Sequence, residues 1–423
     1  MKSGTRRGRR VRAVGAVVSA LVTASVAFAP GAAAADVQSE QWYLEPMQAE
    51  QMWKASTGKG IKVAVIDSGV NPHTDSLKGQ VLTDEVPESV AYGATDDYSG
   101  HGTSMAELIA GTGVNGGIQG LAPGAKVVPY RIQLKDQQEV EDWRKTATEL
   151  EALRAVADTD AQIISMSFGS NIADPDIEAA IKYAASKGKL LIAGVGNDGK
   201  EFISYPAAYP YVLGVSSIDE ISRVSDFSSY GQYVDLVAPG ENIPAYCRPD
   251  FTTYCRGVQG TSQSTAITAA SAALIWSAHP DWTANQVTRA LIDTAGRKWP
   301  KDKPTQKSGY GTIRPRVVLA DPNYDAGDPY SDPLGKWNKK DGEKLVTEIA
   351  PSSAAPSPSA TGASQGAGST SANKAAGAGS KAETVSAESS DDSNTLWIAV
   401  GAAAAVIVVG GATFGVLRAR RAR

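Results

Sequence analysis

The sequence predicts an α/β domain built on a mainly parallel β-sheet, placed between two chain ends of different composition. Short runs of β-branched and other apolar residues recur along the middle of the chain, as expected of strands that are covered on both faces. Segments with apolar residues at three- and four-residue spacing lie between these runs and are typical of amphipathic helices. A strand, helix, strand order implies right-handed crossovers and a doubly wound sheet.

The predicted strands occupy successive apolar runs. They are residues 61–67, 126–132, 161–168, 189–196, 211–218 and 233–240. Predicted helices include residues 139–159 and 175–188, and the second has Pro175 at its start and Gly188 after its end. In such a sheet we expect the functional residues at the carboxyl ends of the strands.

The chain begins with the features of a secretory signal. Residues 1–35 have a basic start, an apolar centre and small residues at the end, where Ala33 and Ala35 fit the A-x-A cleavage preference. An uncleaved anchor is the alternative, which the short apolar part disfavours. Paired arginines at 6–7 and 9–10 are a weak sign of twin-arginine export.

Near the other end, residues 396–417 carry no charge and would span about 33 Å as a helix, enough to cross a membrane. A buried core helix is the alternative, but the basic residues 418–423 follow at once, and positive charge stays on the cytoplasmic side. Residues 350–394, rich in Ala, Ser, Pro and Gly, predict a disordered stalk. We therefore expect a single-pass cell-membrane protein with an extracellular body and a cytoplasmic C-terminus.

The body between these ends, residues 36–340, is acidic and large enough to bury a core. The chain has 423 residues, of which 42% are hydrophobic. Ten of the 41 basic residues lie at the two extreme ends of the chain, within residues 1–12 and 418–423, so the whole stretch between them has 31 basic residues against 45 acidic ones and a formal charge near −14. Nucleic acid is therefore not an expected partner, because phosphate binding requires a basic face.

Polar residues stand near three of the predicted strand ends or helix starts. Asp67 closes the strand IKVAVID, His101 lies between two glycines just ahead of a predicted helix, and Asn197 follows the strand KLLIAGVG. Each has a structural explanation when taken alone, because Asp and Asn are common in turns. The other two histidines, His73 and His279, are interpreted as a loop residue and a helix-end residue.

Ser262 lies in the stretch VQGTSQSTAITAASAALIWSAHP, residues 258–280, where two explanations compete. One is a helix N-cap, because several hydroxyl residues directly precede the predicted helix 265–277. The other is a catalytic nucleophile, which requires a base to take its proton and a further group to orient that base. The two explanations do not exclude each other.

Together these residues resemble the subtilisin family (S8) of serine proteases. Its motifs stand in order over nearly all of residues 40–320, as VAVIDSGV, SGHGTSMAELIAG, GLAPGAKVVPYRI, ISMSFG, GNDG, FSSYG, DLVAPG and GTS. The resemblance implies a three-layer fold, with the sheet between helices, and a serine endopeptidase whose triad is Asp67, His101 and Ser262. It also implies an oxyanion site made by the Asn197 side chain and the backbone N–H of Ser262.

The resemblance implies a binding mode for a protein or peptide substrate. Ser167, Phe168 and Gly169 would form one edge and Gly194 to Gly196 the other, and an extended peptide would add between them as a strand. The absence of side chains at Gly194 and Gly196 suggests an open pocket. Catalysis of this kind needs no cofactor, and no metal is assigned because the Asp and Asn residues show no EF-hand spacing. Structural calcium is left open.

The sequence departs from the usual family pattern in two motifs. After GTS the family commonly has a small or apolar residue, Ala, a small residue and Pro, whereas residues 263–266 read QSTA. Gln263 stands beside the nucleophile, where it could alter the pocket or keep activity low. Ser104 replaces a residue that is commonly His, and its neighbour Thr103 is able to cap the helix that follows His101.

Cys247 and Cys255 are the only cysteines of the chain. In an oxidising compartment they predict a disulfide rather than a metal site, because no His lies nearby. Closing so short a loop is worth about 2 to 3 kcal/mol in the chain-entropy estimate. We expect the bond to fix the loop that presents Ser262.

A short lead before the first strand, a loop disulfide, a stalk and a C-terminal anchor together resemble the mycosins. These are membrane-anchored subtilisin-like proteases linked to type VII secretion, so the resemblance implies secretion components as partners. The alternative function is a catalytically weak or inactive scaffold that binds a secretion partner, with Gln263 as the sign of lost activity.

Overall fold

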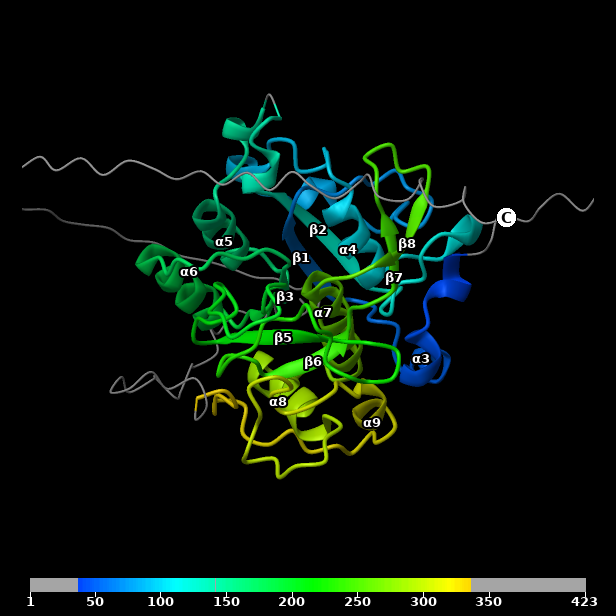
Figure 1. The fold of residues 1–423 in the computed structure, drawn as a ribbon, viewed down its shortest axis with the longest axis vertical. Coiled ribbons are helices and arrows are strands. Elements are labelled where there is room, and N and C mark those ends of the chain that lie inside the picture. The colour runs from blue at the N-terminus through cyan, green and yellow to red at the C-terminus, as the bar shows by residue number, and fades with distance from the viewer. Residues whose placement is uncertain (1–36, 141, 336–423) are drawn as a thin grey trace, which may run out of the picture. The chain divides into compact units, whose positions relative to one another are not determined.

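A computed structural model of the protein describes residues 37–140 and 142–335 (Figure 1). The predicted terminal segments lie outside these residues, namely 1–35, 350–394, 396–417 and 418–423. In the described part of the chain, no helix is both long enough and apolar enough to cross a membrane.

A six-stranded parallel sheet forms the centre of the described residues. Its strands follow the order β2-β1-β3-β4-β5-β6, and each neighbouring pair is parallel. The strands are β1 (Lys62–Asp67), β2 (Lys126–Arg131), β3 (Ile163–Met166), β4 (Leu190–Gly194), β5 (Val212–Ile218) and β6 (Leu236–Pro239). Each strand lies within one of the predicted apolar runs, so this part of the prediction is confirmed.

Helices precede, connect and follow the strands. They are α2 (Leu44–Met47), α3 (Ala49–Trp53), α4 (His101–Ala110), α5 (Glu149–Ala157), α6 (Pro175–Ser186), α7 (Thr261–Ala278), α8 (Ala284–Thr294) and α9 (Pro315–Leu319). The single-turn 3₁₀ helices are η1 (Val37–Glu40), η2 (Thr83–Glu85), η3 (Glu88–Val90), η4 (Val114–Gly116), η5 (Lys135–Gln137) and η6 (Trp143–Lys145).

Of the two helices predicted between strands, α6 begins at the expected residue, whereas α5 begins ten residues late. Thr148 forms a capping box at the start of α5, because its hydroxyl accepts the N–H of Glu151 and the Glu151 carboxylate accepts the N–H of Thr148. The preceding residues form η6, where the indole N–H of Trp143 donates to the carbonyl of Leu134 at 2.8 Å. The predicted range 139–159 was therefore too long at its beginning.

Helices cover both faces of the sheet, because alternate strand residues point into two separate cores (Figure 1). Val63 and Val65 of β1 belong to the core that α4 and α7 share, whereas Ala64 and Ile66 belong to the core of α5 and α6. All four side chains are at most 1% exposed. This arrangement is the predicted three-layer α/β fold.

Helix α7 is buried along nearly its whole length and begins at Thr261, four residues before the predicted start. Three of its buried hydroxyl groups are satisfied inside the helix, since Thr265, Thr268 and Ser271 each donate to the carbonyl four residues earlier at 2.8 Å. These hydroxyl groups can thus be buried without being left unpaired.

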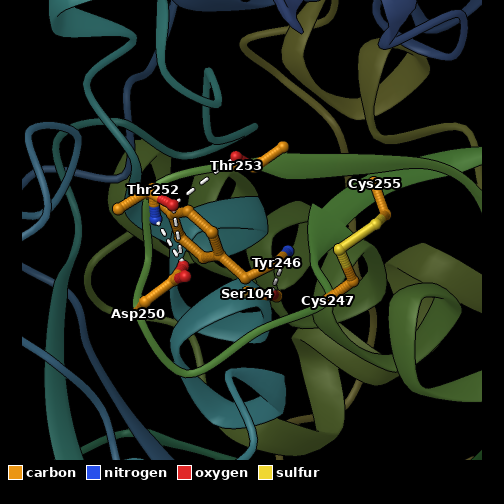
Figure 2. Close-up of a disulfide and its surroundings, with 7 residues drawn as sticks. All are labelled: Ser104, Tyr246, Cys247, Asp250, Thr252, Thr253 and Cys255. Carbon is orange, nitrogen blue, oxygen red and sulfur yellow. Dashed lines mark hydrogen bonds between the residues drawn. A yellow bond between two sulfur atoms is a disulfide. The ribbon is translucent and has the colours of Figure 1, made fainter.

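An antiparallel hairpin of β7 (Ile243–Tyr246) and β8 (Tyr254–Val258) was not predicted from the sequence. Cys247 and Cys255 form a disulfide across its loop, with their Cα atoms 5.5 Å apart (Figure 2). The predicted disulfide is therefore confirmed. We refer to residues 243–258 with this bond as the disulfide hairpin.

Candidate active site

Asp67 and His101 meet at the carboxyl end of β1. His101 Nδ1 lies 2.7 Å from Asp67 Oδ1, and the same oxygen accepts the backbone N–H of Ser68 at 2.7 Å. The Asp67 side chain is only 1% exposed, whereas that of His101 is 37% exposed. A buried carboxylate therefore orients an imidazole that solvent and a substrate can reach.

His101 is the first residue of α4 rather than a residue ahead of it, and the expected cap, Thr103, lies inside the helix. Gly100 stands at the N-cap position, and the Asp97 side chain, three residues before it, accepts the hydrogen bonds of a cap instead. Its Oδ1 accepts the N–H of Gly100 at 2.9 Å, and its Oδ2 accepts the N–H and the hydroxyl of Thr103 at 2.9 and 2.6 Å. The Ser68 hydroxyl also donates to Asp97 Oδ1 at 2.8 Å, so one carboxylate joins the end of β1 to the start of α4.

Asp97 and Ser68 are functional-site residues that the sequence reasoning missed. An Asp shortly before a helix is a capping signal. However, the stretch DDYSGHGT offers two carboxylates and two hydroxyls for that role, and only the folded chain shows which one is used.

Ser262 is the second residue of α7, and it does not cap that helix. Gly260 stands at the N-cap position, and Asn197 Oδ1 accepts the N–H of Thr261 at 2.9 Å. This bond leaves Asn197 Nδ2 free to donate elsewhere. Nδ2 and the backbone N of Ser262 lie 3.6 and 3.8 Å from one point, the position of a Cβ atom built on Gly260. Two nitrogen atoms that carry N–H groups therefore lie close to the same point beside the serine.

Ser262 lies at the same edge of the sheet as Asp67. Its hydroxyl donates to the carbonyl of Ser167 at 3.3 Å, and the Ser167 hydroxyl donates back to the Ser262 carbonyl at 3.3 Å. Ser167 directly follows β3, whose last residue, Met166, is opposite Ile66 of β1. Asp67 with His101, and Ser262 with Ser167, therefore lie at the carboxyl ends of the neighbouring strands β1 and β3, and α4 packs against α7.

The predicted substrate-binding residues lie beside this edge. They directly follow β3 or stand at the end of β4, namely Ser167, Phe168, Gly169, Gly194 and Gly196. At Gly194 the room left by the missing side chain is taken by Thr261, whose Oγ1 lies 2.8 Å from the position of a Cβ atom there. The absence of a side chain at Gly194 therefore allows α7 to pack closely against β4. The sequence had suggested instead that this glycine leaves room for an open pocket.

Gln263 is buried in the first turn of α7, with 3% of its surface exposed. Its Oε1 has no hydrogen-bond partner among the described residues and lies 2.9 Å from the position of a Cβ atom on Gly260. Gln263, which departs from the family pattern, thus places its amide oxygen close to Asn197 Nδ2 and the backbone N of Ser262.

The remaining histidines have the structural positions predicted for them. His73 lies in an exposed turn, where its N–H donates to Asn71 Oδ1 at 2.9 Å. His279 ends α7 and stacks on Trp282 with ring centroids 3.9 Å apart, and burial lowers its pKa. At about 1.5 Å per residue, His279 is about 25 Å from Ser262. Among the described residues, no three His, Cys, Asp or Glu side chains are placed to hold a metal ion.

Comparison with known sequences adds an independent observation. Residues 58–312 match peptidase S8, the subtilase family. The chain is 35% identical over 299 residues to the minor extracellular protease Epr of Bacillus subtilis, an alignment that covers 68% of this chain but 43% of Epr. It is 32% identical over 267 residues to thermitase of Thermoactinomyces vulgaris, covering 61% of this chain and 89% of thermitase.

Solved structures with a similar fold include MycP1 and the MycP3 protease. MycP1 from Mycobacterium smegmatis superposes with a TM-score of 0.56 and 26% identity, covering 68% of this chain and 86% of MycP1. The MycP3 protease from the type VII (ESX-3) secretion system superposes with a TM-score of 0.55 and 29% identity, covering 65% of this chain and 87% of MycP3.

Proposed function

The chain belongs to the subtilase family of serine endopeptidases, and from this premise we propose that it hydrolyses peptide bonds through an acyl-enzyme on Ser262. One observation carries the proposal. His101 is held by a buried carboxylate at 2.7 Å, at the sheet edge where Ser262 lies in the first turn of α7. A serine hydroxyl needs such a base, because it is a poor nucleophile while it keeps its proton.

The contact between Asp67 and His101 assigns the direction of proton transfer. Asp67 accepts the Nδ1–H, so Nε2 is the basic nitrogen and takes the proton of Ser262. For this step the serine hydroxyl turns from the Ser167 carbonyl to the imidazole. Oγ then forms a bond to the substrate carbonyl carbon, and the C–N bond breaks as His101 gives its proton to the leaving amine. Water attacks the resulting ester by the same route.

The attack places negative charge on the substrate oxygen, and we assign its stabilisation to Asn197 Nδ2 and the backbone N–H of Ser262. Both donors lie within 4 Å of one point beside the nucleophile. Asn197 cannot easily turn away, because its other side-chain atom holds the N–H of Thr261. Such fixed donors stabilise the transition state more than the ground state, in which the charge is absent.

Asn197→Ala is expected to lower kcat about 10²- to 10³-fold with little change in KM, the loss that removal of this donor causes in subtilisin. Steady-state kinetics on an unstructured peptide substrate measure both constants. The variant also loses the bond to Thr261, which should lower the free energy of unfolding by about 1 kcal/mol. Asn197→Asp is the matched control, because it keeps the Oδ1 acceptor and loses the donor. A kcat near wild type in Asn197→Asp would contradict the assignment.

The cellular setting of this activity is part of the proposal. Residues 1–35 and 396–417 support an exported protein with a membrane anchor, the catalytic domain outside the cell and residues 418–423 in the cytoplasm. The likeness to MycP1 and MycP3 supports service to a type VII secretion system, with secreted proteins as substrates. No cofactor is needed for the chemistry proposed.

A fluorophosphonate probe tests the proposed chemistry, because it reacts only with a serine that a base has activated. We expect covalent labelling of the folded wild-type protein and none of Ser262→Ala. Ser264→Ala is the control, since Ser264 is two residues along the same helix and its buried hydroxyl donates to the Ala238 carbonyl. Absence of labelling in folded wild type would refute the proposal and favour the non-catalytic scaffold.

A further inference from the structure

We propose that the disulfide hairpin holds the helix of His101 in its working position, with Ser104 and Glu107 as positioning residues. This rests on the proposed function, since it concerns the orientation of the same base. The hairpin meets α4 at residues 100, 104 and 107. Spacings of four and three residues place these positions on one face of a helix, so the contacts form a single line that starts next to His101.

The first contact is made at Gly100, the residue before His101. A Cβ atom on Gly100 would lie 3.1 Å from the Tyr246 Cβ atom and 3.4 Å from the carbonyl oxygen of Arg248. The φ angle of Gly100 is +80°, a region that favours glycine. The hairpin therefore lies directly against the backbone that leads into the catalytic base.

The second contact is made by the Ser104 hydroxyl. It accepts the N–H of Tyr246 at 2.9 Å (Figure 2). It also donates to the carbonyl of Gly100 at 2.6 Å. Ser104 is 2% exposed, so no solvent molecule replaces it easily. One hydroxyl thus joins β7 to the first turn of α4, at a position where the family commonly has His.

The third contact is made by Glu107, a fully buried carboxylate one turn further along α4. Tyr254 donates to its Oε2 at 2.8 Å and Thr74 to its Oε1 at 2.7 Å, while the Tyr246 hydroxyl lies 3.3 Å from Oε1. Burial raises the pKa of Glu107 to about 7, although these hydroxyl groups lower it. A buried carboxylate is tolerated only with such donors, so Glu107 fixes the position of both tyrosines.

The disulfide completes the arrangement. Cys247 directly follows Tyr246 and Cys255 directly follows Tyr254, so the bond joins the hairpin strands right beside the two tyrosines that contact Glu107. Their rings stack with centroids 4.3 Å apart. The hairpin then continues from Val258 to the start of α7. The disulfide hairpin therefore contacts α4, the helix of His101, and also leads to Ser262. The sequence predicted a role for the disulfide only in fixing the loop before Ser262.

Two changes test the proposal, one on each side of the contact between α4 and the disulfide hairpin. They are Ser104→Ala in α4 and the double change Cys247→Ser/Cys255→Ser in the hairpin. Each is expected to lower kcat and the rate of fluorophosphonate labelling about tenfold, with KM within twofold of wild type. The combined variant should lose less than the product of the two effects, because both changes loosen the same link. All rates are measured at a temperature where each variant is fully folded.

Thr252→Ala is the matched control. It removes a hydroxyl that bonds only Asp250 and Thr253 within the hairpin loop (Figure 2), and it should leave kcat unchanged. If Ser104→Ala does not fold, Tyr254→Phe removes the bond to Glu107 and is expected to give the same loss of kcat. Variants with a lower melting temperature but wild-type kcat and labelling rate would show a purely stabilising hairpin and overturn the proposal. Failure of wild type to label would instead refute the proposed function.

Discussion

Replacing His101 with alanine is expected to lower kcat about 10⁶-fold while the protein keeps its fold. This is the loss that the same change causes in subtilisin, and it reflects the poor nucleophilicity of a serine that no base deprotonates. His101 is half-exposed and its ring bonds Asp67, so its removal opens no cavity in the core. Single-turnover hydrolysis of a peptide ester, followed over hours, would measure so small a rate.

The chain supplies controls for this experiment. His73→Ala changes an exposed turn and should leave kcat and the melting temperature unchanged. His279→Ala removes the stacking on Trp282 and should lower stability alone, because it lies at the far end of α7. More than a tenth of wild-type kcat in His101→Ala would remove the base from the proposed mechanism.

Asp67→Asn is expected to lower kcat about 10⁴-fold at neutral pH. The substitution keeps the size of a side chain that is 1% exposed, so the fold should be kept. However, an amide can donate to Nδ1, which favours the imidazole tautomer with its proton on Nε2, where it cannot accept from Ser262. It also removes the charge that stabilises the imidazolium. The expected loss is that of the equivalent change in a chymotrypsin-like protease.

The rate of fluorophosphonate labelling and kcat on a peptide should fall together in Asp67→Asn, because both depend on the same proton transfer. Asp96→Asn is the control, as Asp96 is exposed and one residue from the helix cap Asp97. In the double variant His101→Ala/Asp67→Asn, the loss should match that of His101→Ala alone, since the carboxylate acts only through the imidazole. Independent, multiplying losses would contradict the assigned roles.

The sheet was largely predictable from the sequence, whereas helix starts were not. Strands covered on both faces appear as continuous apolar runs, and this pattern located β1 to β6. Apolar spacing continues upstream of a helix start, so it could not show that Thr148 begins α5 or that Asn197 caps Thr261 at the start of α7. The strands of the disulfide hairpin are too short for their apolar pattern to be recognised in the sequence, although the pairing of its two cysteines was predicted correctly.

The identity of the candidate site residues came from their types, their order and the family resemblance. The structure places Asp67, His101 and Ser262 at one edge of the sheet, and their catalytic roles stay a prediction. Asp97 and Glu107 had no comparable signal, because an acidic residue in a helix or before it is ordinary in any surface segment. Their burial alone distinguishes them, and burial depends on what packs over them.

The sequence by itself therefore determined the α/β class, the strand positions and the residues able to act as acid, base and nucleophile, because apolar periodicity and side-chain chemistry are local properties. Only the tertiary structure decided that Asp97 joins β1 to α4, and that Ser104 and Glu107 connect α4 to the disulfide hairpin. These hydrogen bonds join residues up to 147 positions apart. They exist only at the distances that the packed helices and strands impose.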